Sequence, residues 1–92
     1  TLDLMSIPII QGKTGYPIFI DPSHGTGRKE LILPAVRAAL VLGANGVMIE
    51  VHPEPAKALS DGIQSLNFKE FELLLNNVKK LEQALDEDMV EL

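Results

Sequence analysis

Three side chains able to bind a metal ion follow two short apolar segments of the chain. His24 comes shortly after the apolar run that ends at Asp21, Glu50 lies at the end of the second apolar run, and Asp61 lies in the loop beyond it. Because chemistry in parallel α/β folds sits at the carboxyl ends of the strands, we expect these side chains to meet at one rim. One imidazole and two carboxylates suit Mn²⁺, Fe²⁺ or Zn²⁺ better than a soft metal bound by thiolates. The sequence therefore predicts a metal site made by His24, Glu50 and Asp61.

Each of the three residues also has a plainer interpretation. An ionised carboxylate in a buried strand is costly unless it is paired or bound to metal, so Glu50 either binds metal or forms a structural ion pair. Taken alone, His24 suits a ligand and a helix-capping or hydrogen-bonding residue equally well. Asp61 precedes a glycine, and Asp-Gly is common in turns. The occurrence of all three at expected strand ends or in the following loop favours the metal interpretation.

Further candidates surround this predicted site. His52 alternates with Glu50, so we expect it to face the same side and to donate a hydrogen bond to a ligand or substrate oxygen. The loop over residues 23–27 precedes a helix and offers backbone N–H groups to a phosphate, although a plain tight turn fits equally well. The candidates for substrate or phosphate binding are Ser23, Gly25, Thr26 and Arg28.

The elements that position these residues alternate between helix and strand. Short continuous apolar runs predict buried strands at Pro17–Ile20 and Gly46–His52. Helices are expected at Leu4–Gln11, at Pro34–Leu42, and from Phe68 onward behind an Asn67–Glu70 capping arrangement. Strand, helix and strand in this order imply a parallel, right-handed crossover. Two strands and three helices leave open strand edges, so the chain is expected to be a piece of a larger α/β barrel.

Composition limits the class of protein. The chain has 92 residues, 46% of them hydrophobic, which suits one small unit. Its net charge of -5 argues against nucleic-acid binding, and no apolar run is long enough to predict a membrane span. There is no cysteine, and the first residues lack the pattern of a signal peptide and an initiator Met. We therefore expect a soluble cytoplasmic protein whose natural start lies outside the sequence.

Three motifs in order carry a resemblance to a known family. They are Asp-Pro-Ser-His-Gly-Thr-Gly-Arg at 21–28, Glu-Val-His-Pro-Glu-Pro at 50–55 and Ala-Leu-Ser-Asp-Gly-Ile-Gln-Ser-Leu at 58–66. Together they resemble 3-deoxy-D-arabino-heptulosonate 7-phosphate (DAHP) synthase of the type I-beta group. The resemblance implies that residues 1–92 are the C-terminal part of a TIM (β/α)8 barrel, an incomplete domain with about two parallel strands and three helices. Residues 1–3 then look like the end of the sixth strand.

The resemblance also implies an activity and a set of ligands. These enzymes condense phosphoenolpyruvate with erythrose 4-phosphate in the first step of the shikimate pathway. C3 of phosphoenolpyruvate attacks the aldehyde, water adds at C2, and phosphate leaves with C–O cleavage. His24, Glu50 and Asp61 would be three of four ligands to Mn²⁺, Fe²⁺, Co²⁺ or Zn²⁺, and His52 would orient a substrate. The fourth ligand is a cysteine on an early strand. This chain lacks that cysteine, so we expect the isolated chain to be inactive. We also expect the enzyme to be a homo-oligomer.

Two alternatives remain open at this point. The chain is either part of the enzyme or a non-catalytic piece that associates with itself. A sister family, 3-deoxy-manno-octulosonate 8-phosphate synthase, shares the barrel and a similar Ala-Leu-Ser-Asp-Gly loop. The sequences Asp21–His24 and Gln64–Leu66 favour the heptulosonate enzyme.

Overall fold

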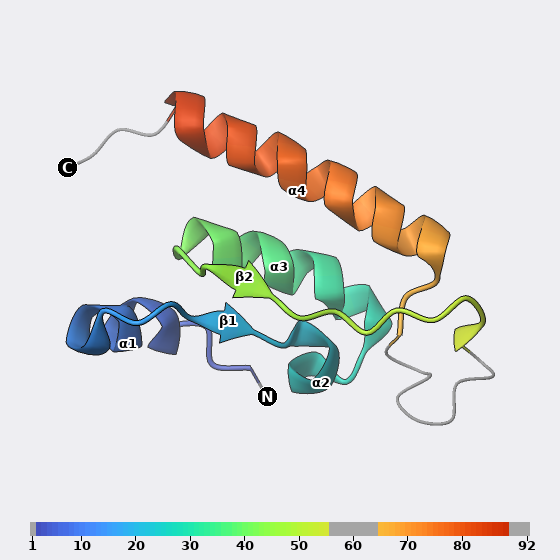
Figure 1. Cartoon of the computed structure of the whole chain (residues 1–92), viewed down its shortest axis with the longest axis horizontal. Coiled ribbons are helices and arrows are strands. Elements are labelled where there is room, and N and C mark those ends of the chain that lie inside the picture. The colour runs from blue at the N-terminus through green and yellow to red at the C-terminus, as the bar shows by residue number, and fades with distance from the viewer. Residues whose placement is uncertain (1, 56–64, 89–92) are drawn as a thin grey trace.

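The computed structural model describes residues 2–55 and 65–88 of the chain. In chain order, the helices and strands are α1 (Ser6–Thr14), β1 (Phe19–Ile20), α2 (Pro22–Thr26), α3 (Ile32–Val41), β2 (Gly46–Val47) and α4 (Phe68–Asp88). A single 3-10 turn, Lys29–Leu31, leads into α3. In Figure 1 the two strands lie side by side, and α3 lies between them and the long helix α4.

The two strands are parallel neighbours, as predicted. Phe19 pairs with Gly46 and Ile20 with Val47, and α3 makes the crossover between them. Both strands are shorter than expected. The backbone N–H of Met48 still donates to the Ile20 carbonyl at 2.8 Å, so hydrogen bonding between the segments continues past the last paired residues.

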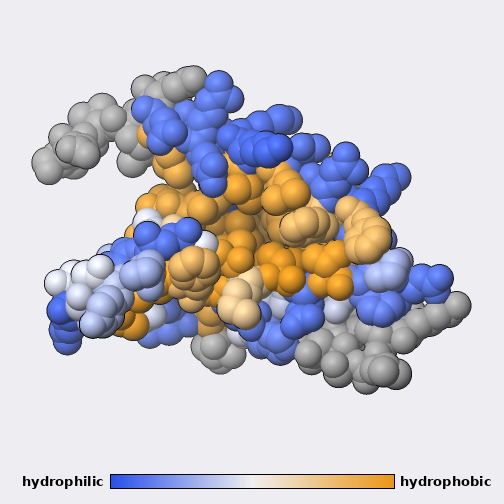
Figure 2. Space-filling view, viewed as in Figure 1, coloured by the Kyte–Doolittle hydropathy of each residue, from blue (hydrophilic) through white to orange (hydrophobic). Residues whose placement is uncertain are grey.

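Side chains alternate between the two faces of the sheet. Ile20 is buried, and Val47 packs against both apolar clusters of the core. Phe19 and Met48, one position away from them, are 61% and 60% exposed. Figure 2 shows apolar side chains gathered across the middle of this view, below the hydrophilic edge formed by α4. Because side chains alternate along an extended segment, we expect Glu50 to share the face of Met48, opposite Val47 and Ile49, which pack against the core.

The core lies on both sides of α3. One cluster joins α3 to α4 and the segment before it, and the other joins α3 to α1 and β1. The buried members of the first cluster are Ile32, Val36, Leu66 and Leu74. Those of the second are Ile7, Ile20 and Ala39. α3 therefore anchors the crossover by burying side chains in two directions.

The expectation of a loop over residues 23–27 is wrong, because this segment contains α2. Asp21 caps the helix by accepting the His24 N–H at 3.0 Å, and Pro22 occupies the first helical position. Gly27, with φ 64°, ends the helix in the left-handed region that favours glycine. A cap, a proline and a terminal glycine thus outweigh the loop-like composition of the segment.

The predicted start of α4 is confirmed. The Glu70 N–H donates to Asn67 Oδ1 at 2.8 Å, and the Asn67 N–H donates to Glu70 Oε1 at 2.9 Å. Lys29 Nζ also lies 2.6 Å from Glu70 Oε1. Burial alone would raise the pKa of Glu70, but the Asn67 N–H and Lys29 together hold it below the ordinary value of 4.5. The reciprocal cap therefore fixes the entry into α4 and ties it to Lys29 beside α3.

Replacing Asn67 with Ala in the complete protein is expected to lower the free energy of unfolding by about 1 kcal/mol. The variant loses the oxygen that accepts the Glu70 N–H. The measurement is the urea dependence of circular dichroism. Asn76→Ala, an exposed asparagine within the same helix, is the matched control and should cost less. Equal losses in the two variants would contradict the capping role.

Among the described residues, no helix is both long and apolar enough to cross a membrane.

Candidate metal centre

The structure brings His24 and Glu50 together at the ends of the two strands. His24 is the third residue of α2, the helix that begins two residues after the end of β1. Glu50 follows the end of β2 by three residues. His24 Nε2 lies 3.8 Å from Glu50 Oε1, and each side chain is close to half exposed. Two residues that are 26 positions apart in the sequence thus present a nitrogen and an oxygen to one point on the rim.

The backbone around Glu50 is held from two sides. Its N–H donates to the hydroxyl of Ser23 at 3.2 Å, and its carbonyl accepts the Leu66 N–H at 2.9 Å. A small hollow of about 90 Å³ opens beside it, lined by Asp21, Met48, Ile49 and Glu50. A water molecule occupies about 30 Å³ in the liquid, so this hollow has room for an ion and bound water.

The separation of the two side chains fits a shared divalent ion. Nitrogen and carboxylate ligands lie about 2.1 Å from a metal such as Zn²⁺, so two ligands of one ion are at most about 4.2 Å apart. The 3.8 Å between His24 Nε2 and Glu50 Oε1 lies within that limit. Asp61, the third predicted ligand, lies outside the described residues. Within the described ranges, no group of three or more His, Cys, Asp or Glu side chains is placed to hold a metal.

Asp21 has a role that the sequence interpretation did not assign. Its Oδ2 lies 2.6 Å from His24 Nδ1, while its Oδ1 accepts the His24 N–H. Burial alone would raise the pKa of Asp21, but hydrogen bonds from the His24 backbone and ring, together with the Ser23 N–H, hold it below 3.8. The sequence feature that indicates this role is the spacing Asp-Pro-Ser-His, because an aspartate that caps a helix lies three residues before the residue whose N–H it accepts.

His52 accepts a hydrogen bond in the loop beyond Glu50. Its Nδ1 accepts the Glu54 N–H at 2.9 Å, and its own backbone N–H donates to the Leu66 carbonyl at 2.9 Å. A neutral imidazole whose Nδ1 accepts carries its proton on Nε2. The ring therefore has a donor available, as its predicted role of donating to a substrate oxygen requires.

The four candidates for phosphate binding, in α2 and just after it, are engaged in contacts within the protein. Ser23 is fully buried, and the Thr26 hydroxyl lies 2.6 Å from the Pro22 carbonyl. Arg28 forms an ion pair with Glu30. Gly25 packs so closely on Leu2 that a Cβ there would lie 2.9 Å from its Cδ1. These contacts account for the conformation of α2 and of Arg28 without a phosphate, so phosphate binding stays a prediction.

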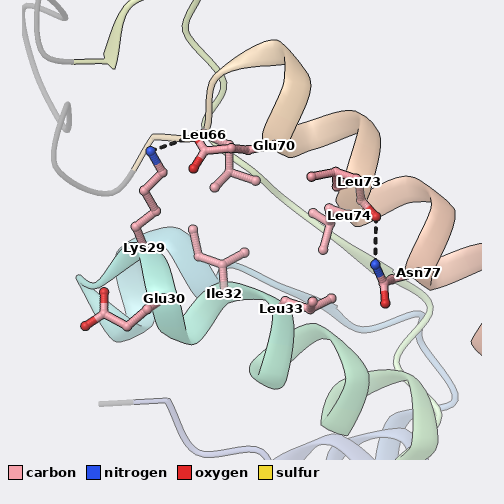
Figure 3. A pocket seen from close by; sticks show the side chains of 9 residues that line it. All are labelled: Lys29, Glu30, Ile32, Leu33, Leu66, Glu70, Leu73, Leu74 and Asn77. Atoms are coloured by element: carbon pink, nitrogen blue, oxygen red, sulfur yellow. Dashed lines mark hydrogen bonds and ion pairs between the residues drawn. The ribbon is translucent and has the colours of Figure 1, made fainter.

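A separate pocket of about 360 Å³ lies between α3 and α4. Figure 3 shows its apolar floor, with the ion pair of Lys29 and Glu70 at one end and Asn77 donating to the Leu73 carbonyl at the other. The nine lining residues are Lys29, Glu30, Ile32, Leu33, Leu66, Glu70, Leu73, Leu74 and Asn77. The candidate ligands His24 and Glu50 do not line it, so this pocket is distinct from the site at the strand ends.

Comparison with known proteins decides the family. The DAHP synthetase I family matches residues 1–87. The chain belongs to this family. A phospho-2-dehydro-3-deoxyheptonate aldolase of Thermotoga maritima is 53% identical over 85 residues, which are 92% of this chain and 25% of the relative. A 2-dehydro-3-deoxyphosphooctonate aldolase of Desulfosudis oleivorans is 38% identical over 97 residues, 94% of this chain and 35% of the relative.

Solved structures confirm the fold class. A truncated form of the DAHP synthase from Thermotoga maritima matches with a TM-score of 0.90 and 53% identity, over 92% of this chain and 32% of that structure. A crystal structure of the aldolase from the same organism matches with the same TM-score over 25% of its length. The chain thus has the α/β fold of part of a TIM barrel. It spans about a quarter to a third of the length of these DAHP synthetase I family relatives.

Proposed function

We propose that this chain supplies one part of the active site of a DAHP synthase, which condenses phosphoenolpyruvate with erythrose 4-phosphate. His24, Glu50 and Asp61 bind a divalent cation, Mn²⁺, Fe²⁺, Co²⁺ or Zn²⁺, and His52 orients a substrate. The observation that carries the proposal is the approach of His24 Nε2 to Glu50 Oε1, 3.8 Å apart beyond two parallel strands. The proposal includes a cytoplasmic location and a homo-oligomeric enzyme that acts on small molecules.

The residues of this chain bind and orient groups in the reaction. A bound divalent cation would act as a Lewis acid on the aldehyde carbonyl of erythrose 4-phosphate. Asp21 accepts from His24 Nδ1, so His24 presents Nε2 toward Glu50. His52 accepts the Glu54 N–H at Nδ1 and donates from Nε2 to a substrate oxygen or to water. Asp21 and Glu50 also line the small hollow at this end of the strands.

The sister activity is the second candidate, because octulosonate aldolases are also among the relatives. The two activities differ in the acceptor aldehyde. Phosphoenolpyruvate contributes three carbons, so a heptulosonate requires a four-carbon aldose phosphate and an octulosonate requires a five-carbon one. The higher identity of the heptonate aldolase, 53% against 38%, favours the four-carbon acceptor.

The test is an assay of the complete, Mn²⁺-loaded protein with phosphoenolpyruvate and each acceptor. We expect kcat/KM to be at least about 10-fold higher with erythrose 4-phosphate, since one extra carbon in a fitted site typically costs that much or more. Mass spectrometry of the product identifies the seven-carbon sugar acid. An equal or higher rate with the five-carbon acceptor would assign the sister activity, and no turnover with either would favour the non-catalytic alternative.

A further inference from the structure

We propose that Asp21 and Ser23, in the first turn of α2, are positioning residues that hold His24 and Glu50 in the arrangement a divalent cation requires. Neither residue is placed as a ligand itself. The inference rests on the proposed function, because it takes His24 and Glu50 as the ligands, and it adds what orients them.

Asp21 selects the tautomer of His24. The two carboxylate oxygens of Asp21 are both used: Oδ1 accepts the His24 backbone N–H at 3.0 Å, and Oδ2 lies 2.6 Å from the ring Nδ1. An ionised carboxylate only accepts hydrogen bonds, so Nδ1 is the nitrogen that carries the proton. In the neutral ring the lone pair is then on Nε2, the atom that faces Glu50. This is the tautomer that binds a metal through Nε2.

Ser23 holds the backbone at Glu50. In the strand direction, the Met48 N–H donates to the Ile20 carbonyl, and the next N–H on the same edge is that of Glu50. By that point the first segment has turned into α2 and offers no strand carbonyl. The hydroxyl of Ser23, a fully buried residue, accepts the Glu50 N–H instead, at 3.2 Å.

The first turn of α2 therefore positions both candidate metal ligands, His24 and Glu50. Asp21 fixes the ring of His24 within α2, and Ser23 fixes the position of Glu50 relative to α2. A ligand pair that is already oriented loses less conformational freedom when an ion binds. The affinity for the ion should thus depend on two side chains that do not contact it.

The first test is Asp21→Asn in the complete protein. Asparagine caps a helix as well as aspartate does, so its Oδ1 keeps the His24 N–H. Its amide nitrogen then lies beside Nδ1 and donates to it, which moves the ring proton to Nε2. We expect the Kd for Mn²⁺ measured by titration calorimetry to rise by about 10- to 100-fold. In the metal-free protein, ¹⁵N chemical shifts of labelled histidine should change from the Nδ1–H to the Nε2–H tautomer.

Two controls separate charge and stability from positioning. Glu72→Gln removes the same charge from an exposed position in α4 and should change neither the Kd nor the histidine shifts. The melting temperature of the metal-free Asp21→Asn protein should stay close to that of the wild type, because the cap is kept.

The second test is Ser23→Ala, which removes the acceptor of the Glu50 N–H. The Kd for Mn²⁺ should rise by about 10-fold, the lower end of the range for such outer partners, while the His24 tautomer stays unchanged. Ser6→Ala, which removes a hydroxyl that donates to the Asp3 carbonyl, is the matched control and should leave the Kd unchanged.

The outcomes distinguish the inference from the function on which it rests. If His24→Ala binds Mn²⁺ as tightly as the wild type, the proposed ligand set fails and the inference with it. If His24→Ala loses Mn²⁺ while Asp21→Asn and Ser23→Ala keep wild-type affinity and the wild-type tautomer, the positioning roles are overturned and the ligand set stands.

Discussion

Replacing Glu50 with Gln in the complete protein is expected to weaken Mn²⁺ binding by at least about 100-fold and to abolish metal-dependent turnover. Loss of an outer partner of a ligand typically costs 10- to 100-fold, and loss of an anionic ligand costs more. The substitution keeps the shape of the side chain and removes its charge. Titration calorimetry with Mn²⁺ and steady-state assays measure the two losses.

The same substitution should leave the fold intact. The Glu50 side chain is 45% exposed, so it contributes little packing. The backbone bonds of Glu50 to Ser23 and Leu66 do not involve the carboxylate. The free energy of unfolding without metal should therefore change by less than about 0.5 kcal/mol.

Glu54→Gln is the matched control, four residues further along. Glu54 is exposed, and the bond that links it to His52 uses its backbone N–H, which the substitution keeps. Near wild-type Mn²⁺ affinity is expected in this variant. Wild-type affinity and turnover in Glu50→Gln itself would refute the metal assignment.

The crossover could be predicted from sequence because its signals are strong and local. The apolar runs before Asp21 and at Glu50 favoured buried strands, and Gly46 marks the start of β2. The glycine also has a spatial reason that the sequence does not reveal: a Cβ at residue 46 would lie 2.6 Å from the ring of Phe19. α2 gives no such signal, because a helix of five residues contains too few positions to show a period, and two of its residues, Ser23 and Gly25, are typical of turns.

The candidate site was predictable where it depends on topology and not where it depends on packing. Parallel strands end at the same rim, and this brought His24 and Glu50 together from a sequence separation of 26 residues. The role of Ser23 was not predictable in this way. Its exposure depends on how the segment around Glu50 docks, which the sequence does not show. The sequence suggests a phosphate contact, whereas in the structure the Ser23 hydroxyl is buried against the Glu50 backbone. Asp61 lies outside the described residues and stays a prediction.

The 92-residue chain expressed alone is expected to form no detectable heptulosonate phosphate. It spans about a quarter to a third of the length of the DAHP synthetase I family relatives, and it contains no cysteine to act as the fourth predicted ligand. Holding reactants and catalytic groups together supplies about 7–11 kcal/mol in well-oriented systems, and we expect a chain of this share of its relatives' length to supply only part of that arrangement. The measurement is a coupled phosphate-release assay with enough chain to detect one turnover per hour.

The isolated chain is also expected to associate with itself. In the described part, the sheet has two strands, so β1 and β2 each keep an unpaired edge. Phe19 and Met48 add exposed apolar surface on the face away from the helices. Sedimentation velocity should show species larger than a monomer, and changing both residues to Ser should shift the distribution toward the monomer. Leu75→Ser, an exposed apolar residue of α4, is the control and should leave association unchanged. A monodisperse monomer in sedimentation velocity would contradict this expectation, because it would mean that the open strand edges and the exposed apolar side chains do not drive association.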